Sequence, residues 1–259
     1  MIQVSQVSKA FMKRQTLFYA LKEISFTLND QSICGLIGLN GAGKTTLLRL
    51  LTGISECTSG IIQFDDYTIS EFNHHRPFKI AYLSNDTQVY HRLTTMEYLQ
   101  FFAKIKKLPR HLFQSRLEEY SYKLKIENEL NTVLEFTSTG TRQKVAFLSV
   151  IISHPDYLFL DEPFSNIDIL VAEEMLNILR NLKELGTSMI ISSHNLYEIE
   201  SVADSILLLN EGNLLINSGL NDLYQQYPEM DLKEIIINFM TQHNMIRSND
   251  VSCDLADLL

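Results

Sequence analysis

Short runs of consecutive apolar residues recur along the chain, and each predicts a strand that is covered on both faces of a sheet. These runs occupy residues 33–37, 80–83, 157–160 and 189–191. Residues 24–28 differ, because apolar and polar residues alternate there, which predicts a half-buried strand. Two later runs, 206–209 and 214–216, flank the turn-forming segment 210–213 and predict an antiparallel hairpin.

Helical patterns lie between the predicted strands. Residues 171–185 place apolar side chains on one broad face, and Gly186 follows at the position of a helix C-cap. A shorter helix, predicted over residues 47–51, follows a glycine-rich turn. Because buried strands alternate with helices, we predict an α/β fold with a mainly parallel sheet, to which the hairpin adds an antiparallel β portion.

The segment from about residue 94 to residue 153 contains no strand-like run, and we expect a helical sub-lobe inserted in the α/β core. Its helical spacing is seen in Phe113, Leu117, Tyr120 and Leu124. The main domain would then span residues 1–220. Residues 221–259 would form a C-terminal helical extension, with a polar tail from about His243.

Composition and charge exclude several classes of protein. The chain has 259 residues, 45% of them hydrophobic, which is enough for one large domain, but no apolar run could span a bilayer. The formal net charge of −9 argues against nucleic acid as the main partner. Cys34, Cys57 and Cys253 are too irregularly spaced for a disulfide framework or a metal site, which favours a reducing compartment. No signal peptide is visible at the N-terminus.

Residues 38–46 fit the phosphate-binding pattern G-x-x-x-x-G-K-[ST]. Glycine lets backbone N–H groups approach phosphate oxygens closely, and the following helix adds its positive N-terminal end. Lys44 would contact the β- and γ-phosphates of ATP, and Thr45 would offer its hydroxyl to Mg²⁺. A chance match arises in roughly one chain of this length in a hundred, but the strand and helix that the motif requires are both predicted here. The expected nucleotide-binding residues are Asn40, Gly41, Ala42, Gly43, Lys44, Thr45 and Thr46.

Asp161 and Glu162 end the buried run 157–160, at the edge of a parallel sheet where ligands bind in such folds. Alone, such a pair is more often a solvated strand end. After a phosphate-binding loop, Asp161 is expected to hold Mg²⁺, usually through water. Glu162 is expected to orient and polarise the attacking water.

Nearly the whole chain resembles the nucleotide-binding subunits of ATP-binding cassette (ABC) transporters. Residues 138–143 stand in the place of the family's signature motif, 23 residues before Asp161. Residues 163–168 resemble its D-loop, and residues 191–194 resemble its switch-histidine segment. The resemblance implies that His194 senses the γ-phosphate, although alone it would be an ordinary strand-end histidine.

The resemblance also implies an adenine-stacking aromatic at Phe11. Phe18 and Tyr19 are rivals for that role, and any of the three could instead belong to the core.

Two positions depart from the family pattern. Asn85 stands where the family has glutamine, with Gln88 three residues later. Asparagine is shorter by one methylene, about 1.5 Å of reach, so its contact to Mg²⁺ or the attacking water is in question.

The signature is degenerate, but Ser138 and Gly140 survive, and in the family these positions meet the γ-phosphate of the partner subunit. A structural alternative, compatible with that role, is that Ser138 or Thr139 only caps the following helix.

The resemblance implies an ATP- and Mg²⁺-dependent ATPase subunit. It would dimerise head-to-tail around two ATP molecules with a second ATPase subunit, identical or not, and would lie on the cytoplasmic face of the cell membrane. Separate integral-membrane permease subunits would carry the transport path. The overall sequence pattern is more similar to exporter ATPases, with import still open. The sequence does not identify the transported substrate, whose binding residues would lie in the membrane subunits.

Two alternatives differ from this reading. One is a regulatory subunit of low turnover, suggested by Asn85 and the altered signature. The other is a soluble ABC ATPase acting on ribosomes or DNA. Such proteins tend to carry paired cassettes or coiled-coil insertions together with basic surfaces, which this chain lacks.

Overall fold

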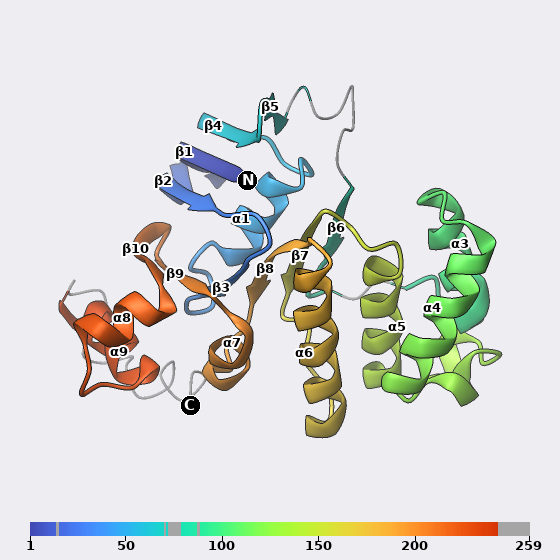
Figure 1. Ribbon diagram of the computed structural model, residues 1–259. Helices are drawn as coiled ribbons and strands as arrows, with labels where there is room; N and C mark the ends of the chain where they lie inside the picture. The colour runs from blue at the N-terminus through green and yellow to red at the C-terminus, as the bar shows by residue number, and fades with distance from the viewer. Residues whose placement is uncertain (14–15, 70, 72–78, 87–88, 243–259) are drawn as a thin grey trace.

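Two β-sheets form the centre of the chain, whose computed structural model describes residues 1–13, 16–69, 71, 79–86 and 89–242 (Figure 1). The strands of the larger sheet are β3 (Ile33–Ile37), β6 (Ile80–Leu83), β7 (Tyr157–Asp161), β8 (Ser188–Ser192), β9 (Ser205–Asn210) and β10 (Asn213–Gly219). Their order across the sheet is β10-β9-β3-β8-β7-β6, and only β10 pairs antiparallel. The predicted α/β fold with a mainly parallel sheet is confirmed.

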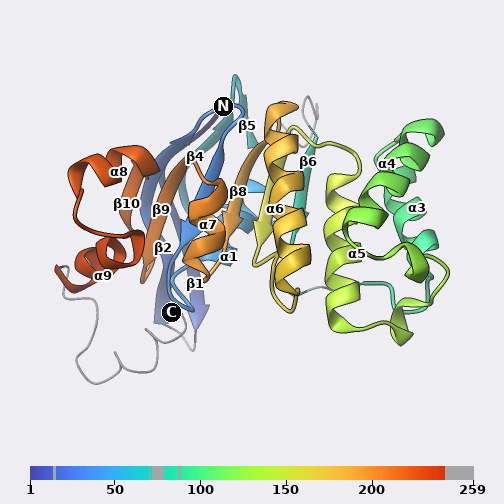
Figure 2. The same ribbon diagram turned by 60° about the horizontal axis from the view of Figure 1, so that its bottom comes forward.

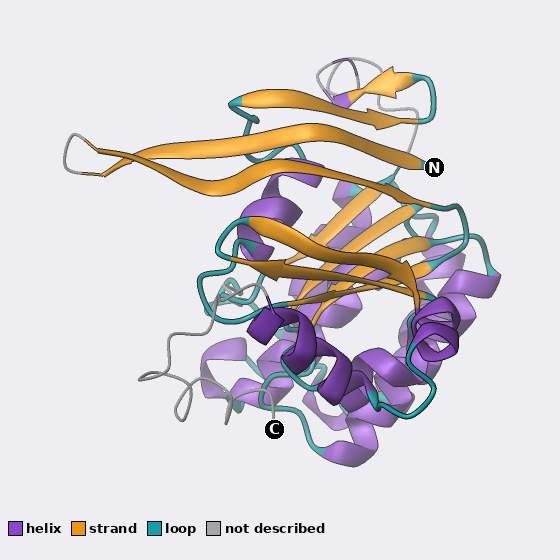
Figure 3. Cartoon of the chain, turned by 90° about the vertical axis from the view of Figure 1, so that its left-hand side faces the viewer, coloured by secondary structure: helices purple, strands orange, loops and turns teal. Residues whose placement is uncertain are grey.

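The smaller sheet is antiparallel and lies beside the larger one. Its strands are β1 (Ile2–Lys13), β2 (Thr16–Leu28), β4 (Ser59–Phe64) and β5 (Tyr67–Thr68), in the order β2-β1-β4-β5. Figure 3 shows the β1–β2 hairpin reaching past the other strands of this sheet. The sequence predicted only residues 24–28 of it. One reason is that the register of β1 shifts between Val4 and Val7 and again before Lys9, which interrupts the period-two pattern on which strand prediction depends.

The two faces of the larger sheet are covered by different elements. One face packs against α1 (Lys44–Leu51) and the smaller sheet, and the other packs against the remaining helices. Successive residues of the parallel strands alternate between these two faces. On β7, Leu158 joins the core that contains the helices of the second face, and Phe159 joins the core around α1. The two-sided burial explains why the central strands read as unbroken apolar runs.

A helical lobe lies beyond β6, as Figures 1 and 2 show, and confirms the predicted insertion. Its helices are α3 (Thr95–Ile105), α4 (Arg110–Lys123) and α5 (Thr139–Ile151). Thr94 starts α3 through a capping box with Glu97. The four residues that indicated helical spacing are all buried: Phe113, Leu117, Tyr120 and Leu124.

The remaining helices cover the sheet and its far edge. They are α6 (Ile169–Glu184), α7 (Leu196–Val202), α8 (Leu220–Gln226) and α9 (Leu232–Gln242). Helix α6 ends one residue earlier than predicted, because Leu185 is the C-cap and its side chain is exposed.

Helices α8 and α9 fall within the predicted C-terminal extension except for Leu220, the first residue of α8, and their buried residues join the same core as Ile206 of β9 and Ile199 of α7. The predicted tail from His243 lies outside the described residues. No helix in the described part of the chain is both long and apolar enough to cross a membrane.

Candidate nucleotide-binding and hydrolysis site

The phosphate-binding loop connects β3 to α1, which begins at Lys44. Gly41 and Gly43 have φ angles of 81° and 112°, in the region that favours glycine. A Cβ atom at Gly43 would lie 2.6 Å from the carbonyl oxygen of Ala20, whereas a Cβ at Gly41 would meet nothing within 4 Å. Gly43 therefore allows the loop to pack against β2, and Gly41 keeps the backbone open toward a ligand.

The Lys44 side chain is buried beneath this loop. Its Nζ donates a hydrogen bond to the carbonyl oxygen of Gly38 and lies 3.9 Å from Oε1 of Glu162. Burial lowers the pKa of Lys44, and the charges of Glu162 and Asp161 oppose that shift. A partly desolvated cation with one distant carboxylate as its ionic partner is well suited to bind phosphate oxygens.

The Asp161 carboxylate is held by hydroxyl groups on both of its oxygens. Thr45 Oγ1 donates to Oδ2 at 2.6 Å, and Ser192 Oγ donates to Oδ1 at 2.7 Å. The contact with Ser192 follows from the strand register, which pairs Asp161 at the end of β7 with Ser192 at the end of β8. The contact with Thr45 arises because α1, of which Thr45 is the second residue, packs against β7.

This arrangement of oxygen atoms fits Mg²⁺ that arrives with a nucleotide. Mg²⁺ is usually bound by one or two carboxylates, with phosphate oxygens and water completing its shell. The hydroxyl of Thr45 and the carboxylate of Asp161 supply protein oxygens at the N-terminus of α1, next to the open backbone at Gly41. Within the described ranges no group of three or more His, Cys, Asp or Glu residues forms a metal cage.

Glu162 and His194 form a contact next to Lys44. Nδ1 of His194 lies 2.8 Å from Oε2 of Glu162, which also accepts the backbone N–H of His194 at 3.3 Å. Glu162 has a φ of 52°, which is uncommon for a residue with a side chain. Its N–H donates to Oγ of Ser192 at 3.0 Å and thereby fixes this turn. A carboxylate held in this way can polarise a water molecule.

These groups surround a cavity of about 330 Å³. The lining residues are Phe11, Phe18, Ala20, Leu39, Asn40, Gly41, Ala42, Gly43, Lys44, Thr45, Thr46, Asn85, Asp161 and Glu162. The structure therefore brings together most of the residues that the sequence predicted, although they come from β1, β2, the loop after β3, α1, the loop after β6 and the end of β7. His194 reaches the cavity wall through its contact with Glu162.

Phe11 and Phe18 line the cavity together. They pair across the β1–β2 hairpin and so lie on one face, whereas Tyr19 pairs with Ala10 and is not among the lining residues. All three aromatic side chains are at least 42% exposed, so the possibility that they belong to the core is wrong. Phe18 is thus a lining residue that the sequence could name only as a rival of Phe11.

Ser138 and Gly140 do not line this cavity. Ser138 is the N-cap of α5, where its Oγ accepts the N–H of Thr141 at 3.0 Å, and Thr139 is the first helical residue. A Cβ at Gly140 would lie 2.7 Å from the carbonyl oxygen of Asn166, so glycine is required where α5 meets the segment after Glu162.

Asn85 lines the cavity from the loop after β6 despite its shorter side chain. Gln88, the alternative in this loop, lies outside the described residues. Ser192 bonds both Asp161 and Glu162, although the sequence analysis assigned no role to it. The available signal was its position at the end of a buried strand, on the same sheet edge as Asp161.

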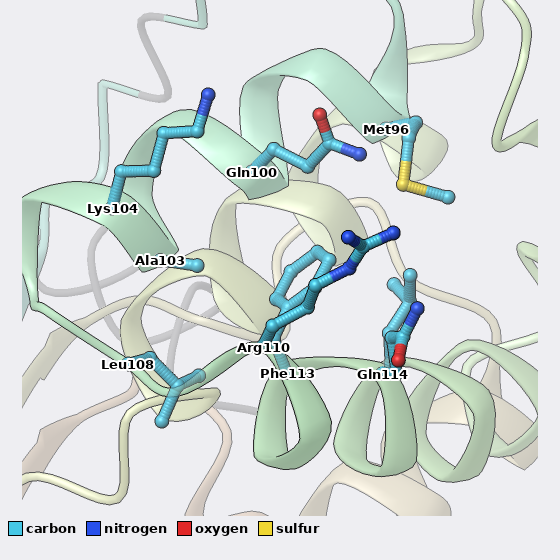
Figure 4. Close-up of a pocket in the computed structure, with 9 residues that line it drawn as sticks. Met96, Gln100, Ala103, Lys104, Leu108, Arg110, Phe113 and Gln114 are labelled. Carbon is cyan, nitrogen blue, oxygen red and sulfur yellow. The ribbon is translucent and has the colours of Figure 1, made fainter.

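A second cavity, of about 470 Å³, lies between α3 and α4 in the helical lobe. Figure 4 shows the Arg110 guanidinium pointing toward Gln100 and Met96 over the ring of Phe113. Lys104 also lines this cavity, and none of its lining residues is acidic. It shares no residue with the site at the phosphate-binding loop.

A family model and curated relatives show that the chain is similar to ABC transporter ATP-binding proteins. A family model described as ABC transporter matches residues 21–165. The chain is 29% identical over 239 residues to the ABC transporter ATP-binding protein NatA of Bacillus subtilis, covering 92% of this chain and 97% of the relative. It is 32% identical over 222 residues to an uncharacterised ABC transporter ATP-binding protein of Methanocaldococcus jannaschii, covering 86% of this chain and 79% of the relative.

Solved structures are similar over most of the chain. One is an ATP-binding subunit of an ABC transporter, with a TM-score of 0.85 and 25% identity, covering 93% of this chain and 99% of that one. Another is a dimeric ATP-binding cassette in a post-hydrolysis state with ADP and Pi, with a TM-score of 0.77 and 21% identity, covering 85% of this chain and 99% of that one. Both confirm the predicted fold.

Proposed function

The chain belongs to the ABC transporter family of ATP-binding cassettes, and from this premise we propose that it is the ATP-hydrolysing subunit that powers export through separate membrane subunits. One observation carries the proposal of hydrolysis. Lys44, Thr45, Asp161 and Glu162 line one cavity and His194 contacts Glu162, with contacts of 2.6 to 3.9 Å among these residues.

The proposed roles follow from these contacts. Backbone N–H groups of the loop and Lys44 bind the phosphates of ATP, and Thr45 and Asp161 hold Mg²⁺. Mg²⁺, when bound, neutralises phosphate charge. Glu162 orients and polarises the attacking water. His194 holds the Glu162 carboxylate in place and, through its exposed ring, can report on the γ-phosphate.

The adenine base would stack on the aromatic pair Phe11 and Phe18, which lines the same cavity. The ring of Phe11 carries the Lys9 ammonium 5.1 Å from its centroid. A cation over an aromatic face is attracted to it electrostatically, so Lys9 helps to hold the exposed ring of Phe11 in place. The pair therefore replaces the single stacking residue expected at Phe11.

We further propose that the site is completed by a second ATPase subunit, identical or not, arranged head-to-tail. The first support is that Ser138 and Gly140 do not line their own cavity. The second is that Phe136, shortly before α5, and Ile169 and Leu170, at the start of α6, are exposed apolar side chains. The solved cassette with ADP and Pi is itself dimeric.

Replacing Ser138 by alanine tests this composite site. ATP-dependent dimerisation and turnover should fall about tenfold, the equivalent of one lost hydrogen bond, while ATP affinity of the isolated monomer stays within about twofold. Sedimentation and a phosphate-release assay measure the two quantities. Because Ser138 also caps α5, Thr94→Ala serves as a matched control that removes the cap of α3 instead. If monomer affinity fell as much as turnover, Ser138 would act in its own pocket.

The membrane subunits would dock on the helical lobe and the loop around Asn85. An aromatic group lies there, in which exposed Tyr90 contacts Phe101 with ring centroids 5.5 Å apart. The cavity lined by Lys104 and Arg110 opens on the same lobe. This docking would hold the subunit on the cytoplasmic face of the cell membrane.

Replacing Asn85 by glutamine tests whether the departure from the family pattern limits turnover. If the shorter amide reaches Mg²⁺ and the attacking water poorly, restoring the methylene should raise basal ATPase activity, by up to about a hundredfold. Dependence on the membrane subunits should fall as well. Steady-state rates with and without the permease measure both effects, and Asn181→Gln on the exposed face of α6 is the control.

Either of two outcomes would contradict this expectation. An unchanged rate would mean that the backbone has already compensated or that Gln88 acts instead. A lower rate would mean that Asn85 is adapted to its own loop. The alternative of a low-turnover regulatory subunit would gain support only if Asn85→Gln raised activity from a very low basal value.

A further inference from the structure

Tyr82 lies beside the Asp161 carboxylate without an assigned role. It belongs to β6 and pairs with Phe159 of β7 in parallel register. Asp161 is two residues further along β7, and side chains two residues apart in a strand lie on the same face. Tyr82 packs into the core that contains Phe159 and helix α1, so its ring lies on the face of the sheet that carries Asp161.

The hydroxyl of Tyr82 is buried and makes no hydrogen bond of normal length in the described part of the chain, although the side chains of Asp161 and Arg49 lie close to it. Buried phenol hydroxyls normally have a partner, because leaving a polar group unpaired away from water is unfavourable. Phenylalanine would fill the same space without that cost. A tyrosine here therefore points to a partner that the nucleotide-free arrangement does not supply.

The surroundings of Tyr82 identify that partner. Burial raises the pKa of Tyr82, the charge of Asp161 raises it further, and the guanidinium of Arg49 opposes both effects. Arg49 follows Thr45 by four residues on α1, so both side chains lie on the same face of that helix. Tyr82 thus lies close to the carboxylate whose two oxygens accept hydrogen bonds from Thr45 and Ser192.

Each carboxylate oxygen can accept more than one hydrogen bond, so Asp161 has acceptor capacity left. Hydrogen bonds in such sites are often long without ligands and shorten when the ligands bind. We propose that Tyr82 is a positioning residue of the Mg²⁺ site, whose hydroxyl donates to the Asp161 carboxylate when nucleotide and Mg²⁺ bind. The inference rests on the proposed function, because it requires Mg²⁺ at Asp161.

Groups that hydrogen-bond a metal-binding carboxylate fix its orientation, and their loss typically weakens metal affinity by 10- to 100-fold. Tyr82→Phe should therefore raise the Mg²⁺ concentration needed to saturate the ATP-loaded chain by about tenfold. ATP affinity measured in EDTA should stay within about twofold of the wild type. The melting temperature of the nucleotide-free chain should be unchanged or higher, because the variant removes an unpaired buried hydroxyl.

A Mg²⁺ titration followed with a fluorescent ATP analogue, together with thermal unfolding, measures these quantities. Tyr157→Phe is the matched control, because it removes a strand hydroxyl that bonds Asp65 and the N-terminal amine, away from the site. It should leave the Mg²⁺ midpoint unchanged.

The inference about Tyr82 is overturned if Tyr82→Phe leaves the Mg²⁺ midpoint within twofold of the wild type. It is also overturned if the variant lowers the melting temperature of the nucleotide-free chain, which would indicate a purely structural hydroxyl. Failure of the proposed function looks different, because the wild-type chain itself would then bind no ATP or show no response to Mg²⁺. That result would reject both the proposed function and the inference about Tyr82.

Discussion

Replacing Lys44 by alanine should reduce ATP turnover by about a hundredfold to a thousandfold, the range seen when one charge-stabilising donor is removed from an active site. Lys44 is the cation buried at the phosphate-binding loop, and its nearest ionic partner, Glu162, is 3.9 Å away. The phosphates of ATP would therefore lose the charge that faces them most directly. ATP affinity by calorimetry and phosphate release measure the two parts of this loss.

The control for charge is Lys22→Ala, since Lys22 is an exposed lysine on β2 near the same loop. It should leave both quantities unchanged, and thermal unfolding should show that both variants are folded. Normal affinity and normal turnover in Lys44→Ala would refute the assignment of the phosphate-binding loop.

Replacing Glu162 by glutamine should preserve ATP binding but slow hydrolysis by about a hundredfold to ten-thousandfold, the contribution typical of a general base. The amide keeps an oxygen that can accept the backbone N–H of His194, and it removes a negative charge near Lys44 and the expected γ-phosphate. The variant should therefore accumulate as an ATP-bound dimer. Single-turnover hydrolysis and size measurement with and without ATP check this.

Glu198 provides a matched control for this variant. It is a second acidic residue near His194, where burial raises its pKa and Ser193 Oγ donates to it at 2.5 Å. Glu198→Gln should keep its turnover. If it lost activity while Glu162→Gln kept wild-type rates, the role of base would pass to Glu198.

The phosphate-binding loop and the pair Asp161 and Glu162 could be predicted because each is a contiguous segment whose function depends on its own backbone and on the strand before it. The choice between Phe18 and Tyr19 could not be made in this way. It depends on the cross-strand register with Phe11 and Ala10, which bulges in β1 have shifted.

Other features depend on contacts between distant segments. Ser192 meets Asp161 because β7 and β8 are neighbours in the sheet. Tyr82 lies close to Asp161 because β6 pairs with β7. The dual position of Ser138, as helix cap and as a residue outside its own cavity, also needs the folded arrangement.

The buried side chain of Gln143 joins the helical lobe to the backbone at Glu162, the carboxylate that we propose as the base. Its Nε2 donates to the carbonyl oxygen of Pro163 at 3.1 Å and approaches that of Glu162 at 3.4 Å. One turn earlier on α5, Gly140 leaves room for the backbone of Asn166. The helix and the peptide that follows Glu162 are therefore mechanically connected, so that if membrane subunits dock on the lobe as proposed, a movement of α5 would reach the Glu162 carboxylate.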